Sequence, residues 1–104
     1  MLRTVLEMTV RPGAEDAFRA AWLETARRAA RLPGSVAQTL LRDPDRPADH
    51  VIMADWSGPD ALDAFQRSPE RAELSARLEQ FRDGARKRVL ETVEHVPAQP
   101  PVER

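Results

Sequence analysis

The stretch HVIMADWSGPDALDAF (His50–Phe65) passes from an apolar run to a polar corner and then to a second apolar segment. Alternation divides the first part into two faces, and the run closes on Trp56, which is typical of a short strand. The corner SGPD has the composition of a helix start, with a capping serine and a proline in the first turn. The stretch therefore predicts a strand over 50–56 that leads directly into a short helix.

Upstream of this stretch, the sequence has three further periodic segments. Residues 2–10 alternate as in a strand with one strongly apolar face. Helical spacing predicts an amphipathic helix over 14–32, with an apolar stripe of Phe18, Trp22, Ala26 and Ala29. A second strand is predicted over 35–43, and the Pro- and Asp-rich connection over 43–49 predicts a hairpin into the next strand.

Downstream, Ser68 and Pro69 predict a renewed helix start. The buried stripe of this helix would hold Leu74, Leu78 and Phe81, and Gly84 would end it. The last strand is predicted over 86–96. Residues 97–104 are too rich in proline for anything but an extended tail, so we expect a single domain over 1–96 followed by that tail.

The order of these elements is β-α-β-β-α-β, which is the ferredoxin-like arrangement of the α+β class. Both helical segments can cover only one face of a four-stranded sheet. The other face would carry a mixture too apolar for water and too polar for a dry core: Val5, Glu7, Thr9, Val51, Met53 and Asp55. A second copy of the sheet is the natural cover, so we predict a symmetric homodimer.

Composition excludes several classes of function. The chain has 104 residues, 41% of them hydrophobic, and a formal net charge of -1. It therefore has no excess of positive charge that would attract nucleic acid or an anionic membrane. It has no cysteine, and no carboxylates are spaced around His50 or His95 as metal ligands would be, so we expect no metal site. Arg3 and Glu7 interrupt the N-terminal apolar run, which argues against a signal peptide and for a cytoplasmic protein.

Two segments resemble the antibiotic biosynthesis monooxygenase (ABM) domain family. They are VRPGAEDAF with the following Trp22, and VIMADWSGPDALDAFQRS, and the resemblance extends over about residues 1–96. The runs LLRDPDRPADHVIMADW, AFQRS and FRDG are similar to the small oxygenases of aromatic (type II) polyketide pathways, of the tetracenomycin and anthrone oxygenase kind. The resemblance implies a dimeric α+β barrel with a pocket between the helices and the sheet of each subunit.

The resemblance also implies a reaction: oxidation of a phenolic polycyclic polyketide to a quinone, without a cofactor and with molecular oxygen as co-substrate. An electron-rich phenol can itself reduce dioxygen once it is deprotonated, so the protein has only to bind it, favour its anion and exclude water. The sequence carries no G-x-G-x-x-G, Walker or G-x-S-x-G motif that would indicate another chemistry.

Three residues are candidates for the chemistry. The resemblance implies that Trp56 contacts the substrate, while packing against Phe65 is the alternative. Asp55 has the chemistry of a general base, but alternation points it away from Trp56, and a carboxylate on the barrel face is the alternative. Arg82 could hold a phenolate as a fixed cation, or could be an exposed arginine at a helix end.

Other residues are candidates to line the pocket through apolar or polar contacts with a substrate. Each could instead be ordinary core or lie at a dimer edge. They are Leu6, Met8, Trp22, Gln38, Ile52, Phe65 and Phe81.

The sequence departs from the family pattern in one helix and leaves other functions open. Many polyketide-pathway relatives carry histidines in the helix that here reads SPERAELSARLEQF (Ser68–Phe81), and none is present. One alternative is a non-catalytic protein of the same fold that binds a polyketide or assists a cyclase. Another is a stress-response enzyme that acts on small quinones or aldehydes.

Overall fold

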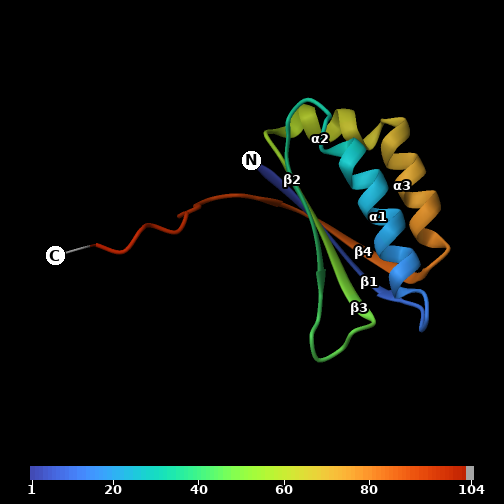
Figure 1. Ribbon diagram of the computed structural model, residues 1–104. Helices are drawn as coiled ribbons and strands as arrows, with labels where there is room; N and C mark the ends of the chain where they lie inside the picture. The colour runs from blue at the N-terminus through green and yellow to red at the C-terminus, as the bar shows by residue number, and fades with distance from the viewer. Residues whose placement is uncertain (103–104) are drawn as a thin grey trace.

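The computed structural model describes residues 1–102, and its elements follow the predicted order. They are β1 (Leu2–Val10), α1 (Glu15–Ala29), β2 (Ser35–Arg42), β3 (Asp49–Trp56), α2 (Pro59–Gln66), α3 (Pro69–Glu79) and β4 (Arg82–Glu91). The strands form an antiparallel sheet in the order β2-β3-β1-β4, and the helices lie on one side of it (Figure 1). The predicted α+β, ferredoxin-like fold is confirmed.

Cross-strand pairing decides which side chains face the helices. Leu6 of β1 lies opposite Ile52 of β3 and opposite Lys87 of β4, and residues paired in this way point to the same side of a sheet. Ile52 is buried in the core with helix residues, so this whole row faces the helical layer. The alternate residues, such as Val5 and Met53, face the open side of the sheet.

The core between the sheet and the helices has two parts. The larger cluster contains Met8, Val10, Phe18, Ala21, Trp22, Ala26, Ile52 and Leu78. The smaller cluster contains Ala54, Trp56 and Leu62. The predicted stripe of α1 is confirmed, because its aromatic and alanine positions are buried.

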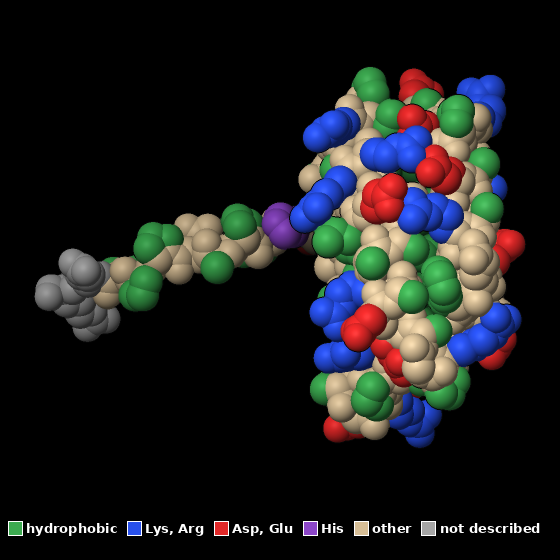
Figure 2. Space-filling model, turned by 45° about the vertical axis from the view of Figure 1, so that its right-hand side comes forward, with side chains coloured by type: hydrophobic (Ala, Val, Ile, Leu, Met, Phe, Trp, Pro, Cys, Tyr) green, Lys and Arg blue, Asp and Glu red, His purple; other side chains and the backbone are tan. Residues whose placement is uncertain are grey.

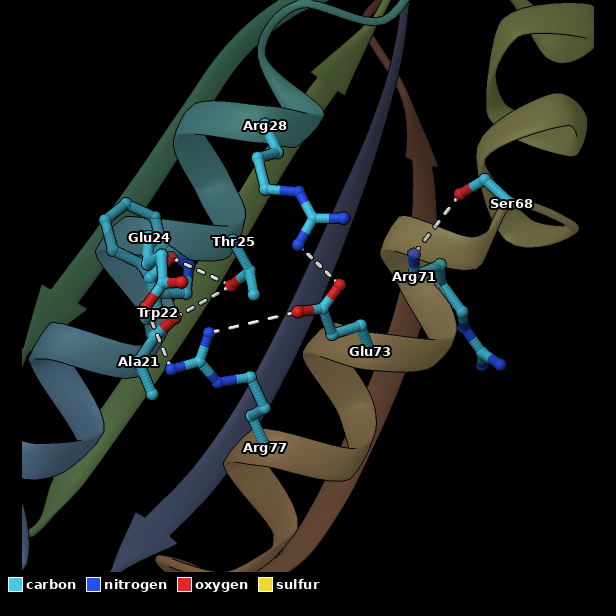
Figure 3. Close-up of polar contacts among 9 residues, drawn as sticks. All are labelled: Ala21, Trp22, Glu24, Thr25, Arg28, Ser68, Arg71, Glu73 and Arg77. Atoms are coloured by element: carbon cyan, nitrogen blue, oxygen red, sulfur yellow. Dashed lines mark hydrogen bonds and ion pairs between the residues drawn. The ribbon is translucent and has the colours of Figure 1, made fainter.

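An ion-pair chain joins α1 to α3 on the outside of the helical layer (Figure 3). Arg77 bonds to Glu24 at 2.9 Å, and Arg28 bonds to Glu73. The hydrogen bond from Arg77 holds the pKa of Glu24 below its ordinary value. Arginines and carboxylates alternate over this face of the molecule, as Figure 2 shows.

The boundaries of β4 differ from the prediction. The strand was expected over 86–96, but it begins at Arg82 and ends at Glu91. Gly84, which was expected to end the preceding helix, lies inside the strand. The reason is that Arg82 already pairs with Val10 of β1, so the chain enters the sheet directly after α3.

Gly84 belongs to an irregularity in the β1–β4 pairing. Glu7 pairs with Arg86 and Thr9 pairs with Asp83, so β4 has one more residue than β1 across this step. Gly84 has a φ of 63°, which is the left-handed conformation that a glycine bulge requires. A glycine that follows an apolar helical stripe can thus form a bulge in the next strand as well as end the helix.

The two predicted helix starts have different outcomes. Ser68 caps α3, since its Oγ accepts a hydrogen bond from the backbone N–H of Arg71 at 3.2 Å. Ser57 does not cap α2. Gly58 holds that position without a side-chain bond, and the backbone N–H of Ser57 donates instead to the carbonyl of Gly34 at 2.8 Å.

Beyond β4 the chain extends away from the body of the molecule (Figure 1). The backbone N–H of Thr92 still donates to the carbonyl of Met1 at 2.9 Å, and the segment from there to residue 102 has no regular structure. The last two residues of the predicted tail, 103–104, lie outside the described ones. No helix within residues 1–102 is long and apolar enough to cross a bilayer.

Candidate functional site

A cavity of about 260 Å³ lies between the sheet and helices α2 and α3, where the two core clusters meet. The sheet supplies Thr4, Leu6, Gln38, Ile52, Ala54, Arg82, Ala85 and Lys87. The helices supply Leu62, Phe65, Gln66, Arg71, Leu74, Ser75, Leu78 and Glu79. Small-molecule pockets commonly measure about 300–1,000 Å³, so a flat polycycle would occupy this cavity and extend beyond its rim.

The interior of the cavity is apolar and its rim is charged. Ile52, Leu62 and Leu78 are buried, whereas Arg71 and Lys87 are exposed. An apolar slot of this kind binds flat, weakly hydrated molecules by removing their surface from water. The polar groups around it would decide how such a molecule is oriented.

Arg82 brings a buried positive charge to the cavity wall. The residue is only 8% exposed, and its Nη1 donates to the sulfur of Met8, a weak acceptor, at 3.5 Å. Among residues 1–102 it forms no ion pair. Burial lowers the pKa of Arg82, and Glu79 opposes that shift. Since a guanidinium stays charged in proteins, its spare donors form a binding group for an anionic oxygen.

Trp56 lies behind the cavity wall. Its side chain is fully buried, and its ring stacks on Phe65 with the centroids 4.6 Å apart and the planes at 27°. Phe65 lines the cavity directly. The Nε1 of Trp56 is buried and has no hydrogen-bond partner within the described part of the chain. Trp56 therefore fixes the position of the ring that a ligand would touch.

The cavity brings together five of the residues singled out from the sequence. They are Leu6, Gln38, Ile52, Phe65 and Arg82. Leu6 and Ile52 reach it because they are paired on the helical side of the sheet. Gln38 comes from β2, opposite Ala54, and its Nε2 lies 3.4 Å from the Ser35 hydroxyl.

The other candidates lie elsewhere. Asp55 is on the open side of the sheet, where both its oxygens accept hydrogen bonds from Arg3, at 2.6 and 3.2 Å. Met8 is in the main core and is not among the cavity residues, although its sulfur contacts Arg82. Trp22 borders a separate, open groove of about 480 Å³ between α1 and β2. Phe81 packs against the main core just after α3.

The sequence-based list of site residues left out many of the residues that line the cavity, among them Arg71, Ser75 and Lys87. Arg71 and Ser75 lie on the helix face of Leu74 and Leu78, at the three- and four-residue spacing that could have found them. Lys87 gave no such signal. Its place follows from its pairing with Leu6, which only the folded sheet establishes.

The histidines have separate surroundings. His50 is buried, packs edge-on against Phe18 with the ring centroids 5.3 Å apart, and places Nδ1 3.1 Å from the carbonyl of Ala48. His95 is exposed beyond β4. Residues 1–102 contain no group of three or more His, Cys, Asp or Glu side chains that could hold a metal ion.

The family model for antibiotic biosynthesis monooxygenase matches residues 1–77. The chain belongs to this family. In this ABM chain the matched residues contain every element from β1 to α2 and nearly all of α3, so they provide most of the cavity wall. No curated protein matches the sequence.

Solved structures of the ABM fold are similar over nearly the whole chain. SnoaB, a cofactor-independent oxygenase from Streptomyces nogalater, in a mutant form, is 27% identical with a TM-score of 0.84, and the match covers 93% of this chain and 97% of SnoaB. A putative antibiotic biosynthesis monooxygenase from Nitrosomonas europaea is 15% identical with a TM-score of 0.81, covering 90% and 100%. One from Deinococcus radiodurans is 13% identical with a TM-score of 0.84, covering 96% and 100%. The latter two likenesses concern the fold alone.

Proposed function

We propose that this ABM protein is a cofactor-independent monooxygenase that oxidises a phenolic polycyclic aromatic polyketide to a quinone with molecular oxygen. One observation carries the proposal: Arg82, a buried arginine that forms no ion pair among residues 1–102, lines a cavity with largely apolar walls. The description of SnoaB as a cofactor-independent oxygenase, at 27% identity, supports the reaction type.

The reaction balances without an external reductant. The ring carbon of the substrate exchanges two hydrogens for one oxygen atom of O₂, and the other oxygen atom leaves as water. The substrate supplies all the electrons, since its CH₂ group becomes a carbonyl. Loss of a proton from the phenolic ring system makes it electron-rich enough to reduce O₂, so favouring the anion is the contribution required of the protein.

Different side chains of the cavity bind the anion, hold the ring system and exclude water. Arg82 binds the phenolate oxygen and makes the anion more stable inside the cavity. Leu6, Ile52 and Phe65 hold the flat ring system and exclude water from it. Gln38 offers an amide for a second oxygen of the substrate. Trp56 acts as a positioning residue behind Phe65, and Asp55, held by Arg3 on the far side of the sheet, has no part in this scheme.

We also propose that the protein is a homodimer, with the open sides of two sheets facing one another. The open side of this sheet carries Val5, Val51 and Met53 without any helix above them. The Arg3–Asp55 pair neutralises part of the charge on that side. A second copy would bury this apolar surface, as sheet-on-sheet packing does in other proteins.

The test is oxidation of a reduced anthrone in air by the purified protein with no added cofactor. We expect oxygen uptake equal in moles to quinone formed, at a rate well above that of anthrone alone. Arg82→Met removes the charge but keeps much of the volume. Hydrogen bonds to charged groups contribute about 1.5–3 kcal/mol, so the Arg82→Met variant should have a kcat/KM lower by about tenfold or more. Arg27→Met, on the exposed side of α1, should leave kcat/KM unchanged.

Two outcomes would contradict the proposal. Saturable binding of the anthrone without oxygen uptake would indicate a polyketide-binding protein. Turnover confined to small quinols or aldehydes would indicate a stress-response enzyme of the same fold.

A further inference from the structure

The rim of the cavity carries two exposed cations that come from different elements. Arg71 lies in the first turn of α3, and Lys87 lies on β4. Lys87 is paired with Leu6 and so points to the helical side of the sheet, toward α3. Both residues line the cavity beside its buried arginine, Arg82.

Neither rim cation is neutralised by the charges around it. Figure 3 shows the side chain of Arg71 pointing away from the ion-pair chain that joins α1 to α3. Within residues 1–102, neither Arg71 nor Lys87 forms an ion pair. Glu79 is the one carboxylate among the cavity residues, and it acts on Arg82. The cavity wall therefore has three positive side chains and one negative.

The two rim cations are close enough to affect one another. Partial burial lowers the pKa of Lys87, and repulsion from Arg71 lowers it further. Among the described residues, the other titratable groups that line the cavity are Arg71 and Glu79 from α3 and Arg82 from β4. The neighbouring strand β1 contributes Thr4 and Leu6, which do not titrate. An anion placed between Arg71 and Lys87 would relieve this repulsion.

We propose that Arg71 and Lys87 form a carboxylate-binding subsite, which selects polycyclic substrates that carry a carboxylate on the edge remote from the reacting ring. This inference rests on the proposed function and adds a class of substrate to it. The cavity volume of about 260 Å³ makes the edge of a larger polycycle extend to the rim. There the planar guanidinium of Arg71 can bind a carboxylate through two N–H donors, and the ammonium of Lys87 can bind it as a point charge.

Equilibrium binding of two redox-inert ligands tests the subsite without any turnover. Anthraquinone-2-carboxylate and anthraquinone-2-carboxamide have the same flat body and differ in charge. At low salt and neutral pH, the wild-type protein should bind the carboxylate about fivefold more tightly, as expected for exposed ion pairs. In Lys87→Met and in Arg71→Met the preference should fall to about twofold or less. Arg27→Met, which removes an exposed cation from α1, should keep it.

Binding of the carboxamide is the internal control. It should be equal in all four proteins, because the apolar part of the cavity is unchanged. Equal affinity of the wild type for both ligands would overturn the inference, and so would an equal loss of preference in Arg27→Met. Oxidation of an anthrone by the same preparations would leave the proposed function standing in either case.

A second measurement uses the fact that Lys87 is the only lysine in the sequence. Lysine labelled with ¹³C at Cε gives one side-chain signal, whose titration reports the pKa of Lys87. Binding of the carboxylate should raise that pKa, because an opposite charge favours the protonated amine. The carboxamide should not change it. A pKa that responds equally to both ligands would contradict a carboxylate between Arg71 and Lys87.

Discussion

Arg82 combines two properties that seldom occur together: it is buried and it has no carboxylate partner among the described residues. Burial of such a charge is destabilising, and Glu79, which acts on Arg82 without forming an ion pair, offsets the desolvation only in part. Such groups are found where a ligand supplies the missing partner. The cost of folding around Arg82 is consistent with a binding role for its guanidinium.

Trp56→Phe is expected to reduce turnover several-fold. The smaller ring leaves space behind Phe65, which stacks on Trp56 at 4.6 Å between ring centroids, so the cavity wall becomes less well positioned. Steady-state oxidation of an anthrone measures the effect, and sedimentation should show the same oligomeric state. Trp22→Phe, in the separate groove beside α1, is the matched control. Unchanged turnover in Trp56→Phe would show that Trp56 only packs.

For individual residues, the sequence predicted only part of the site. Alternation correctly grouped Leu6 with Ile52, because burial of one face imposes a period of two on a strand. Trp56 was placed on the correct face, but its distance from the cavity depended on Phe65, which comes from α2. Lys87 could not be found, because its position depends on the register of β4 against β1.

Among the elements, β4 shows that the same local sequence pattern can end a helix or form a bulge in a strand, depending on the tertiary contacts around it. Gly84 follows an apolar helical stripe and so resembles a helix stop. The same residue in a bulge lets β4 pair with β1 on both sides of an irregular step. Backbone pairing with β1 begins at Arg82 and thereby fixes where α3 must end.

Gly84→Ala is expected to destabilise the protein by about 1 kcal/mol, because an L-residue is strained at a φ of 63°. A Cβ at this position would meet no atom within 4 Å, so strain rather than a clash is the cause. Chemical denaturation measures the change. Gly84→Asn should cost less, since asparagine tolerates this conformation better. Equal stability of Gly84→Ala and the wild type would contradict the assigned conformation.

The link between α1 and α3 should depend on pH through Glu24. Arg77 lowers the pKa of Glu24 in the folded protein, so the pair contributes stability above the ordinary pKa of a glutamate. That contribution is lost as the pH falls through the lowered value. Glu24→Gln should therefore lower the thermal midpoint at neutral pH, and the difference from the wild type should disappear once the pH has fallen below the lowered pKa of Glu24.

Glu94→Gln is the control, because it removes the same charge beyond the end of β4. Its midpoint should match that of the wild type across the pH range. A difference between Glu24→Gln and the wild type that persists in acid would show that charge pairing is not its cause.

For the whole molecule, the open side of the sheet should be the dimer interface. Met53→Glu adds a charge at the centre of that side, between Val5 and Thr39. Burying an unpaired carboxylate between two sheets is costly, so we expect monomers by sedimentation with unchanged circular dichroism. Leu23→Glu, at an exposed position on α1, should remain dimeric. A monomeric wild type, or a dimeric Met53→Glu, would contradict this interface.

The sequence by itself determined the class of fold, the order of the elements and the faces of the strands. These properties follow from local periodicity, because burial of one side imprints a repeat on each segment. Only the tertiary structure decided the start of β4, the placement of Trp56 behind Phe65, and the meeting of Arg71, Arg82 and Lys87 around one cavity. Those features depend on strand register and on helices packed against the sheet, and contacts between distant segments leave no periodic signal in the sequence.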